Sequence, residues 1–84
     1  MVTGRIHPGE ANSSFICEGF LEYICSDEPK AKEFRQNFVA YVIPMINPDG
    51  VVVGNYRTSL FGKDLNRTFN QSRKFAFPET FHLL

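Results

Sequence analysis

The hydrophobic positions in the first half of this chain form three stretches, each typical of a different element. Residues 2–6 indicate the end of a strand. Residues 38–46 are nearly all apolar and rich in β-branched and aromatic side chains, which predicts a strand buried on both faces. Between them, residues 11–26 predict a helix with one apolar stripe, made of Phe15, Ile16, Gly19, Phe20, Tyr23 and Ile24.

Signals at the ends of these stretches complete an α/β pattern. Asn12 and the serines after it can cap the first helix, and Ser26 or Asp27 can cap a second, short helix with Pro29 in its first turn. Pro44 should interrupt strand pairing near the end of the second strand. The order strand, helix, helix, strand predicts an α/β unit with a parallel crossover. In such units the loops at the carboxyl ends of the strands commonly carry the functional residues.

The second half of the chain predicts mostly loop. Residues 47–50, Asn-Pro-Asp-Gly, are typical of a tight turn, because proline presets φ and the flanking polar side chains bond back to the backbone. Residues 54–71 show no sustained period. Within residues 75–84, Pro78 marks a place where a helix can begin.

Composition limits the fold and suggests a partner. With 84 residues, the chain buries about 60 to 65% of its unfolded surface. Its net charge is zero, but residues 1–54 carry four basic and seven acidic side chains, whereas residues 55–74 carry five basic ones against Asp64 alone. This asymmetry indicates an anionic partner near residues 55–74, with a solvated basic loop as the alternative.

The remaining composition excludes other classes. No apolar run approaches the roughly 18 residues of a membrane span, and we expect neither a signal peptide nor a membrane or nucleic-acid partner. Cys17 and Cys25 lie eight residues apart on the first predicted helix, about 12 Å along its axis, too far for a disulfide. We expect both to be reduced packing residues in a cytoplasmic protein. The three N-x-S/T sequons, at Asn12, Asn66 and Asn70, are attributed to chance.

His7 and Glu10 are the candidate metal ligands. They lie three positions apart, just after the first predicted strand, and imidazole nitrogen and carboxylate oxygen are both good ligands of Zn²⁺. A catalytic zinc site needs three protein ligands and an open position. His82 is the only other histidine, and its surroundings favour a partly exposed helix residue. The sequence therefore predicts about half of a zinc site.

The loop residues suggest binding of a carboxylate. An arginine can grip a carboxylate through two parallel hydrogen bonds, so Arg67 with the neighbouring Asn66 forms a candidate clamp. Arg57 is a second cation that could stabilise an oxyanion. Asp64 could accept a hydrogen bond from the free ring nitrogen of His7 and fix its orientation on a metal.

Four motifs, HPGE, NPDG, GNYR and DLNR, stand in this order along the chain. Together they resemble the zinc metallocarboxypeptidases, in particular the cytosolic carboxypeptidase subfamily. The run NPDGVVVGNYRTSLFGKDLNR, residues 47–67, is similar to the signature of that subfamily without a gap. The resemblance extends over residues 3–69, and the pair Phe77-Pro78 can continue it.

The resemblance implies a fold and a reaction. The fold is an α/β/α sandwich with a mixed, mostly parallel sheet, of which residues 1–84 would be a partial catalytic domain truncated at both ends. The reaction is zinc-dependent hydrolysis of the last peptide bond, with a glutamate as general base. Cytosolic members act on acidic tails and remove glutamate from tubulin and similar proteins.

The resemblance also implies residue roles. His7 and Glu10 match two of three zinc ligands, and Asn66 with Arg67 matches the pair that binds the substrate's C-terminal carboxylate. Arg57 is similar to the catalytic arginine that polarises the scissile carbonyl. Asp64 matches the aspartate that orients a ligand histidine from outside the metal's own coordination shell.

The departures from the family pattern leave alternatives open. The third ligand histidine, the catalytic glutamate and the tyrosine that lines the substrate site have no counterpart here, so we expect the isolated chain to be inactive. One alternative is a non-catalytic protein that uses the clamp to recognise acidic C-terminal tails. Another is a zinc amidohydrolase acting on small acylated amino acids, which shares the His-x-x-Glu pair but would not be expected to carry the run at 47–67.

Overall fold

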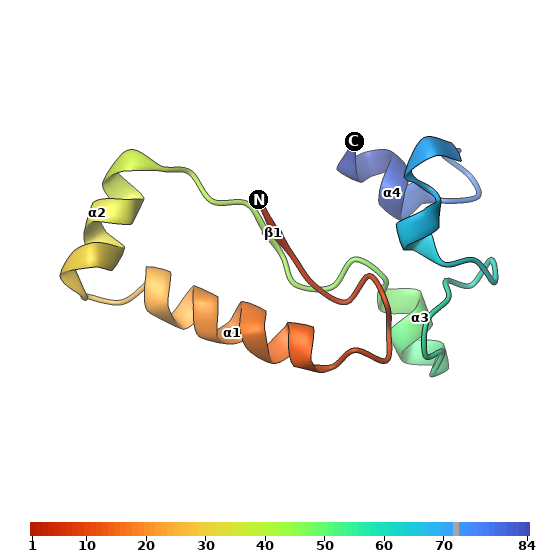
Figure 1. The fold of residues 1–84 in the computed structure, drawn as a ribbon, viewed down its shortest axis with the longest axis horizontal. Helices are drawn as coiled ribbons and strands as arrows, with labels where there is room; N and C mark the ends of the chain where they lie inside the picture. Colours follow the sequence, from red (N-terminus) through yellow and green to blue (C-terminus); the bar gives the residue numbers. More distant parts are fainter. Residues whose placement is uncertain (72) are drawn as a thin grey trace.

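The computed structural model describes residues 1–71 and 73–84 as an elongated α/β unit measuring 44 × 24 × 15 Å (Figure 1). Its Cα radius of gyration is 14.8 Å, against about 12 Å for a compact domain of this length. The elements are β1 (Val2–Thr3), α1 (Asn12–Ile24), α2 (Pro29–Asn37), β2 (Val42–Ile43), α3 (Pro48–Val53), the 3₁₀ turns η1 (Leu65–Arg67) and η2 (Phe69–Gln71), and α4 (Pro78–Leu83).

The two strands confirm the predicted parallel crossover. β1 pairs with β2 in parallel, with Val2 opposite Val42 and Thr3 opposite Ile43, and α1 and α2 form the connection between them. α1 covers 12–24 of the predicted 11–26, and α2 begins at Pro29, which was predicted to lie in its first turn. The predicted side-chain caps are wrong, because α1 begins after Ala11 and α2 after Glu28 with no side-chain hydrogen bond to either first turn. Helices and parallel strands thus follow the predicted α/β order.

The second strand is much shorter and more exposed than predicted. β2 covers Val42–Ile43 rather than 38–46, and Phe38, Val39 and Tyr41 are exposed. Within the described residues the sheet has two strands, so no second neighbour covers this stretch. The prediction of burial on both faces is wrong for this chain, because an apolar composition gives a strand burial only where other elements pack on it.

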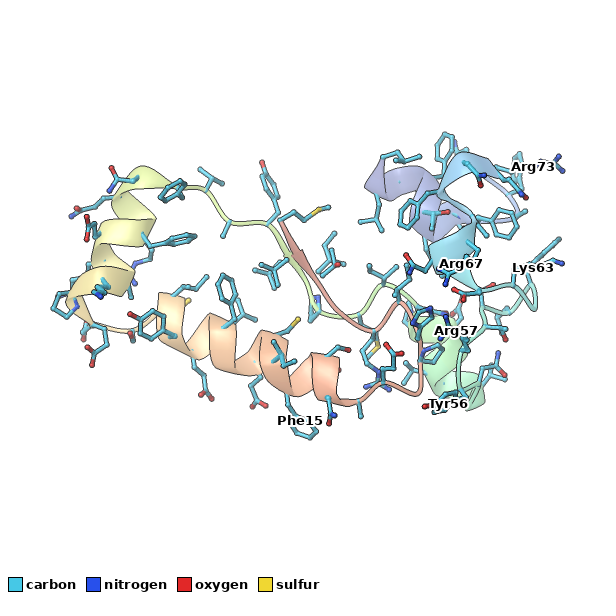
Figure 2. All side chains as sticks on the ribbon, in the orientation of Figure 1. Phe15, Tyr56, Arg57, Lys63, Arg67 and Arg73 are labelled. Carbon is cyan, nitrogen blue, oxygen red and sulfur yellow. The ribbon has the colours of Figure 1, made fainter. Side chains whose placement is uncertain are left out.

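The apolar stripe predicted for α1 is also partly wrong. The face that α1 turns to the strands carries Ser13, Cys17, Phe20 and Ile24, spaced by three or four residues. Cys17 packs against Gly4, where an added Cβ would lie 3.0 Å from its Sγ. Phe15 and Ile16 are 68% and 69% exposed, and Figure 2 shows Phe15 pointing away from the strands.

The cysteine predictions divide in the same way. Both thiols are free, as expected. Cys17 is buried, which confirms a packing role for it, whereas Cys25 is exposed at the C-cap of α1, so the packing role predicted for it is wrong.

The main apolar cluster lies at the other end of the molecule. It consists of Ile46, Leu65 and Phe77, with Ile6, Ile43, Ala76 and Leu83 packed against it. Leu65 is fully buried. The cluster joins the ends of both strands to η1 and to α4, which begins at the predicted Pro78. It therefore fixes the loop between α3 and α4 close to the carboxyl ends of the strands.

The Asn-Pro-Asp-Gly segment does more than form a turn. Asn47 caps α3 by accepting a hydrogen bond from the backbone N–H of Gly50, and Pro48 occupies the first helical position. Gly54, at φ 86°, ends the helix in a left-handed conformation. The segment is therefore the first turn of a short helix, and Asn47 bonds back to the backbone as predicted.

Candidate metal and carboxylate site

The site is built where the chain leaves β1 and meets the loop after α3. His7 is buried, and its two ring nitrogens face two different carboxylates. Nε2 lies 2.9 Å from Oδ1 of Asp64, a residue 57 positions later in the chain. Nδ1 lies 3.3 Å from Oε2 of Glu10. The fold thus brings together three of the residues that the sequence singles out.

Asp64 is the hub of this arrangement. Burial alone would raise the pKa of its carboxyl group, but hydrogen bonds outweigh burial and hold that pKa below its ordinary value of 3.8. The donors are the ring of His7, the backbone N–H of Asn66 at 2.9 Å, and Nε of Arg57 at 2.8 Å. Asp64 is therefore an ionised acceptor at neutral pH.

The ionised state of Asp64 determines which face of His7 is open. A carboxylate only accepts hydrogen bonds, so Nε2 carries the proton that it donates to Asp64. In a neutral ring the other nitrogen, Nδ1, then carries a lone pair directed at the carboxylate of Glu10. Two acceptors 3.3 Å apart repel each other unless a cation or a proton lies between them.

The spacing of these two acceptors fits Zn²⁺. Ligand bonds of about 2.1 Å at tetrahedral angles place two ligand atoms about 3.4 Å apart. The observed separation between Nδ1 and Oε2 is 3.3 Å. The donor set, one imidazole and one carboxylate, is also of the type that zinc prefers. His7 and Glu10 therefore fit as two zinc ligands, although the described residues contain no group of three or more metal-ligating side chains.

Backbone contacts fix the turn that carries both ligands. The N–H of Gly9 donates to the carbonyl of Tyr56 at 2.7 Å, and the N–H of Glu10 donates to the carbonyl of His7 at 3.2 Å. A Cβ on Gly9 would lie 2.3 Å from the ring of Tyr56. Because the turn touches the loop after α3 so closely, only glycine fits there without a shift of one of them.

Arg57 is held beside the metal ligands by Asp64. Its Nε donates to Oδ2 of Asp64, while Oδ1 of the same carboxylate accepts from His7. The Arg57 side chain is about half exposed. Within residues 1–71 and 73–84, the two terminal nitrogens of its guanidinium make no hydrogen bond, so they remain able to bind an oxyanion.

Asn66 and Arg67 lie in η1, immediately after Asp64. Both are exposed, and together with Phe69 and Asn70 they line a shallow hollow in the surface. Among residues 1–71 and 73–84, the guanidinium of Arg67 makes a single hydrogen bond, a long one of 3.4 Å to the carbonyl of Asn66. Figure 2 shows Arg57 and Arg67 on the same end of the molecule. Glu10 lines another hollow, together with Tyr56 and the start of α1.

Comparison with known proteins identifies the family. A sequence profile described as zinc carboxypeptidase matches residues 1–81. The chain belongs to the zinc carboxypeptidase family. It is 54% identical over 82 residues to cytosolic carboxypeptidase 2 of Xenopus tropicalis and 51% identical over 82 residues to cytosolic carboxypeptidase 3 of Mus musculus. In each case the match covers 98% of this chain and 8% of the relative.

A solved structure of the family supports the fold. The metallo-carboxypeptidase of Burkholderia cenocepacia superposes with a TM-score of 0.89 at 30% identity, covering 96% of this chain and 23% of that one. The fold class implied by the resemblance is thus confirmed as a metallocarboxypeptidase fragment of helices and parallel strands. No helix in the described ranges is long and apolar enough to cross a membrane.

Several residues that build this site escape sequence reasoning. Asn47 is fully buried, and its side-chain N–H groups lie 3.3 Å from the carbonyls of Ile6 and Thr58. It therefore joins the chain before His7 to the loop that carries Arg57. Its place in NPDG indicates a turn, but nothing in the sequence indicates these long-range bonds. The contacts that Arg5 and Ser13 make near the candidate ligands were not predicted either.

His82 lies outside this site. It is exposed in the last turn of α4, and its ring makes an edge contact with Phe81. Its exposed position in a helix agrees with what the sequence favours for it. As with the other candidate residues, the roles at the site stay predictions.

Proposed function

We propose that this chain is the part of a zinc-dependent carboxypeptidase that supplies two zinc ligands and the clamp for the substrate's terminal carboxylate. The proposed reaction removes C-terminal residues, with glutamate preferred, from acidic protein tails such as those of tubulin in the cytoplasm. The chain spans 8% of the cytosolic carboxypeptidases named above, so the activity belongs to a longer protein. In isolation we expect the chain to be inactive.

One observation carries the proposal. Asp64 fixes the proton of His7 on Nε2, which leaves Nδ1 facing the Glu10 carboxylate at a separation suited to a shared cation. A buried histidine kept only for packing would not need its second nitrogen directed at another acceptor. This arrangement supports the roles of His7 and Glu10 as ligands and of Asp64 as the residue that orients His7.

The remaining residues have complementary tasks in this proposal. When bound, zinc supplies Lewis-acid polarisation of the scissile carbonyl and activation of the attacking water. Arg57, anchored through Nε, can donate from its terminal nitrogens to the carbonyl oxygen as negative charge develops there. Arg67 and Asn66 bind the terminal carboxylate and so position the last peptide bond.

The preference for acidic tails rests on charge. Figure 2 shows Lys63 and Arg73 on the same end of the molecule as Arg57 and Arg67, all with exposed side chains. Clustered cations attract anionic peptides and speed their encounter, an effect that weakens as salt is added. The names of the relatives support a cytoplasmic location.

The ligand pair is tested by titrating the chain with ZnCl₂ and following the ring resonances of both histidines by NMR. We expect weak zinc binding that shifts the ring resonances of His7 and leaves those of His82 unchanged. His7→Ala should abolish the response, whereas His82→Ala, a matched control in the same chain, should keep it. Equal zinc binding by His7→Ala and the unaltered chain would reject His7 as a ligand.

The clamp is tested with a peptide that ends in glutamate and with the same peptide amidated at its C-terminus. We expect the chain to bind the free acid more tightly, and Arg67→Ala to remove the difference while Arg73→Ala keeps it. Zinc-dependent hydrolysis of the peptide by the 84-residue chain would contradict its expected inactivity. Tight binding with no zinc response would favour the non-catalytic binder of acidic tails.

A further inference from the structure

We propose that Arg5 is a positioning residue that sets the spacing between the two metal ligands. The inference rests on the proposed function, in that it takes His7 and Glu10 to be those ligands. The side-chain hydrogen bonds of Arg5 go to Pro8 and Ser14 rather than to either ligand. Arg5 acts through the turn that lies between the two ligands.

The backbone at Arg5 is the first observation. Its φ is 51°, and it is the one non-glycine residue with positive φ within residues 1–71 and 73–84. Its carbonyl accepts a hydrogen bond from the N–H of Asn47 at 3.1 Å. Such a conformation is costly for a residue with a Cβ and persists only where the surroundings hold it. The chain is thus forced to change direction two residues before His7.

The side chain of Arg5 is the second observation. Nε and Nη2 both donate to the carbonyl of Pro8, with Nε at 2.9 Å, and Nη1 donates to Oγ of Ser14 at 3.1 Å. Pro8 stands between the two ligands and is fully buried. The rigid fork of the guanidinium therefore fixes the turn relative to the start of α1, a task that a single ammonium group could not perform.

Ser13 links Arg5 to Glu10 itself. Its hydroxyl accepts from the backbone N–H of Arg5 at 2.9 Å and donates to the carbonyl of Glu10 at 2.8 Å. On the other side of the turn, the N–H of Gly9 is bound to the carbonyl of Tyr56. The segment between the ligands is consequently held from two sides, by Arg5 and Ser13 on one and by the loop after α3 on the other.

Arg35 offers a matched comparison. Its Nη1 donates to the carbonyls of Ile24 and Ser26, the latter at 2.9 Å, and so clamps the connection between α1 and α2. This is the same kind of contact, an arginine bound to backbone carbonyls, but it lies in the α1–α2 connection rather than at the site. A general contribution of arginine clamps to folding would affect both positions alike.

The experiment measures zinc affinity and urea midpoint on the same samples of the 84-residue chain. The affinity is read from the His7 ring resonances during titration with ZnCl₂. Arg5→Gly removes the guanidinium contacts but tolerates positive φ. We therefore expect about a 10-fold or greater loss of zinc affinity with little change in the urea midpoint. Arg5→Lys and Ser14→Ala, which removes one partner of the guanidinium, should each lose less zinc affinity than Arg5→Gly but bind more weakly than the unaltered chain. Arg35→Gly should lower the midpoint and leave the zinc affinity unchanged.

The possible results separate this inference from the proposed function. Unchanged zinc affinity in Arg5→Gly, with His7→Ala still abolishing binding, overturns the positioning role alone. An equal loss in Arg35→Gly overturns it too, since the effect is then a general one on folding. Unchanged binding in His7→Ala overturns the proposed function, and the role of Arg5 falls with it. If Arg5→Gly does not fold, Ser14→Ala is the deciding variant. A zinc affinity of Ser14→Ala equal to that of the unaltered chain rejects the positioning role of Arg5.

Discussion

The crossover helices α1 and α2 and the segment from Asn47 to Arg67 are held in opposite ways. α1 and α2 form long, regular elements that leave large apolar side chains exposed, among them Phe15 and Ile16. The segment from Asn47 to Arg67 has little regular structure, yet its polar side chains bond to distant carbonyls and to His7. Regular structure and a defined site are thus separate properties of this chain.

The physical difference lies in where each region finds its partners. Helical hydrogen bonds are satisfied locally, so α1 forms without covering its outer face. A loop has no such ladder, and each buried polar group in it needs a specific partner elsewhere in the fold. Changes in the loop should therefore cost far more than changes on the outer face of α1, and the predictions below test this from the largest effect to the smallest.

Leu65→Ala should have the largest effect. Leu65 is fully buried between Ile46 and Phe77, and removal of a buried leucine side chain costs about 2 to 5 kcal/mol of the free energy of unfolding. Ile16→Ala, on the outer face of α1, is the control and should change it by less than about 0.5 kcal/mol. Urea denaturation followed by circular dichroism measures both. Similar losses for the two variants would end the distinction between the regions.

Asn47→Ala should come next, at about 2 to 3 kcal/mol. The change removes the cap of α3 and the donor to the part-buried carbonyl of Ile6, and it leaves the carbonyl of Thr58 with the side chain of Asn55 as donor. Asn37→Ala serves as control, because Asn37 is exposed and donates only to the carbonyl of Glu33 within α2. Urea midpoints of the two variants decide, and a larger shift for Asn37→Ala would contradict the importance of the long-range bonds.

These two residues also show how much the sequence could predict. The crossover helices and the parallel pairing follow from prolines and apolar periods, which are local signals, although the side-chain caps predicted for α1 and α2 do not form. The zinc ligands and the clamp were assigned from motifs, and their roles remain to be tested. The length and burial of β2 were predicted wrongly because they depend on neighbours that a periodic pattern does not specify.

The parts of the site that could not be predicted are those made by distant contacts. The contact of Asp64 with His7, across 57 positions, is the exception, because the sequence did suggest that hydrogen bond. Arg5 gives no sequence signal at all, since its positive φ and its bonds to Pro8 exist only once β1, α1 and α3 are assembled. The apolar stripe of α1 was predicted partly wrongly for a related reason, because the helix carries more apolar residues than the strands cover.

A pair of glycine substitutions should have effects of opposite sign. Gly9→Ala places a Cβ against the ring and the carbonyl of Tyr56, and we expect a loss of about 1 to 3 kcal/mol in the free energy of unfolding. Gly19→Ala adds a methyl group to the exposed middle of α1, where no atom lies within 4 Å, and should stabilise the chain by about 0.5 to 1 kcal/mol. Thermal unfolding compares them directly, and the same sign for both would be inconsistent with a tightly packed turn at Gly9.

The smallest effect is expected for Phe15→Ser on the outer face of α1. Because Phe15 is mostly exposed in the folded chain, its loss removes little buried area and should change the free energy of unfolding by less than about 0.5 kcal/mol. Exposed apolar groups of this size do favour association between molecules, so the substitution should raise the concentration at which the chain begins to aggregate. Light scattering over a concentration series measures that onset, with Glu18→Ser, an exposed polar position on the same helix, as control. A loss of more than about 1 kcal/mol in the free energy of unfolding for Phe15→Ser would mean that this face of α1 is packed in solution. The two regions would then not differ in the way proposed here.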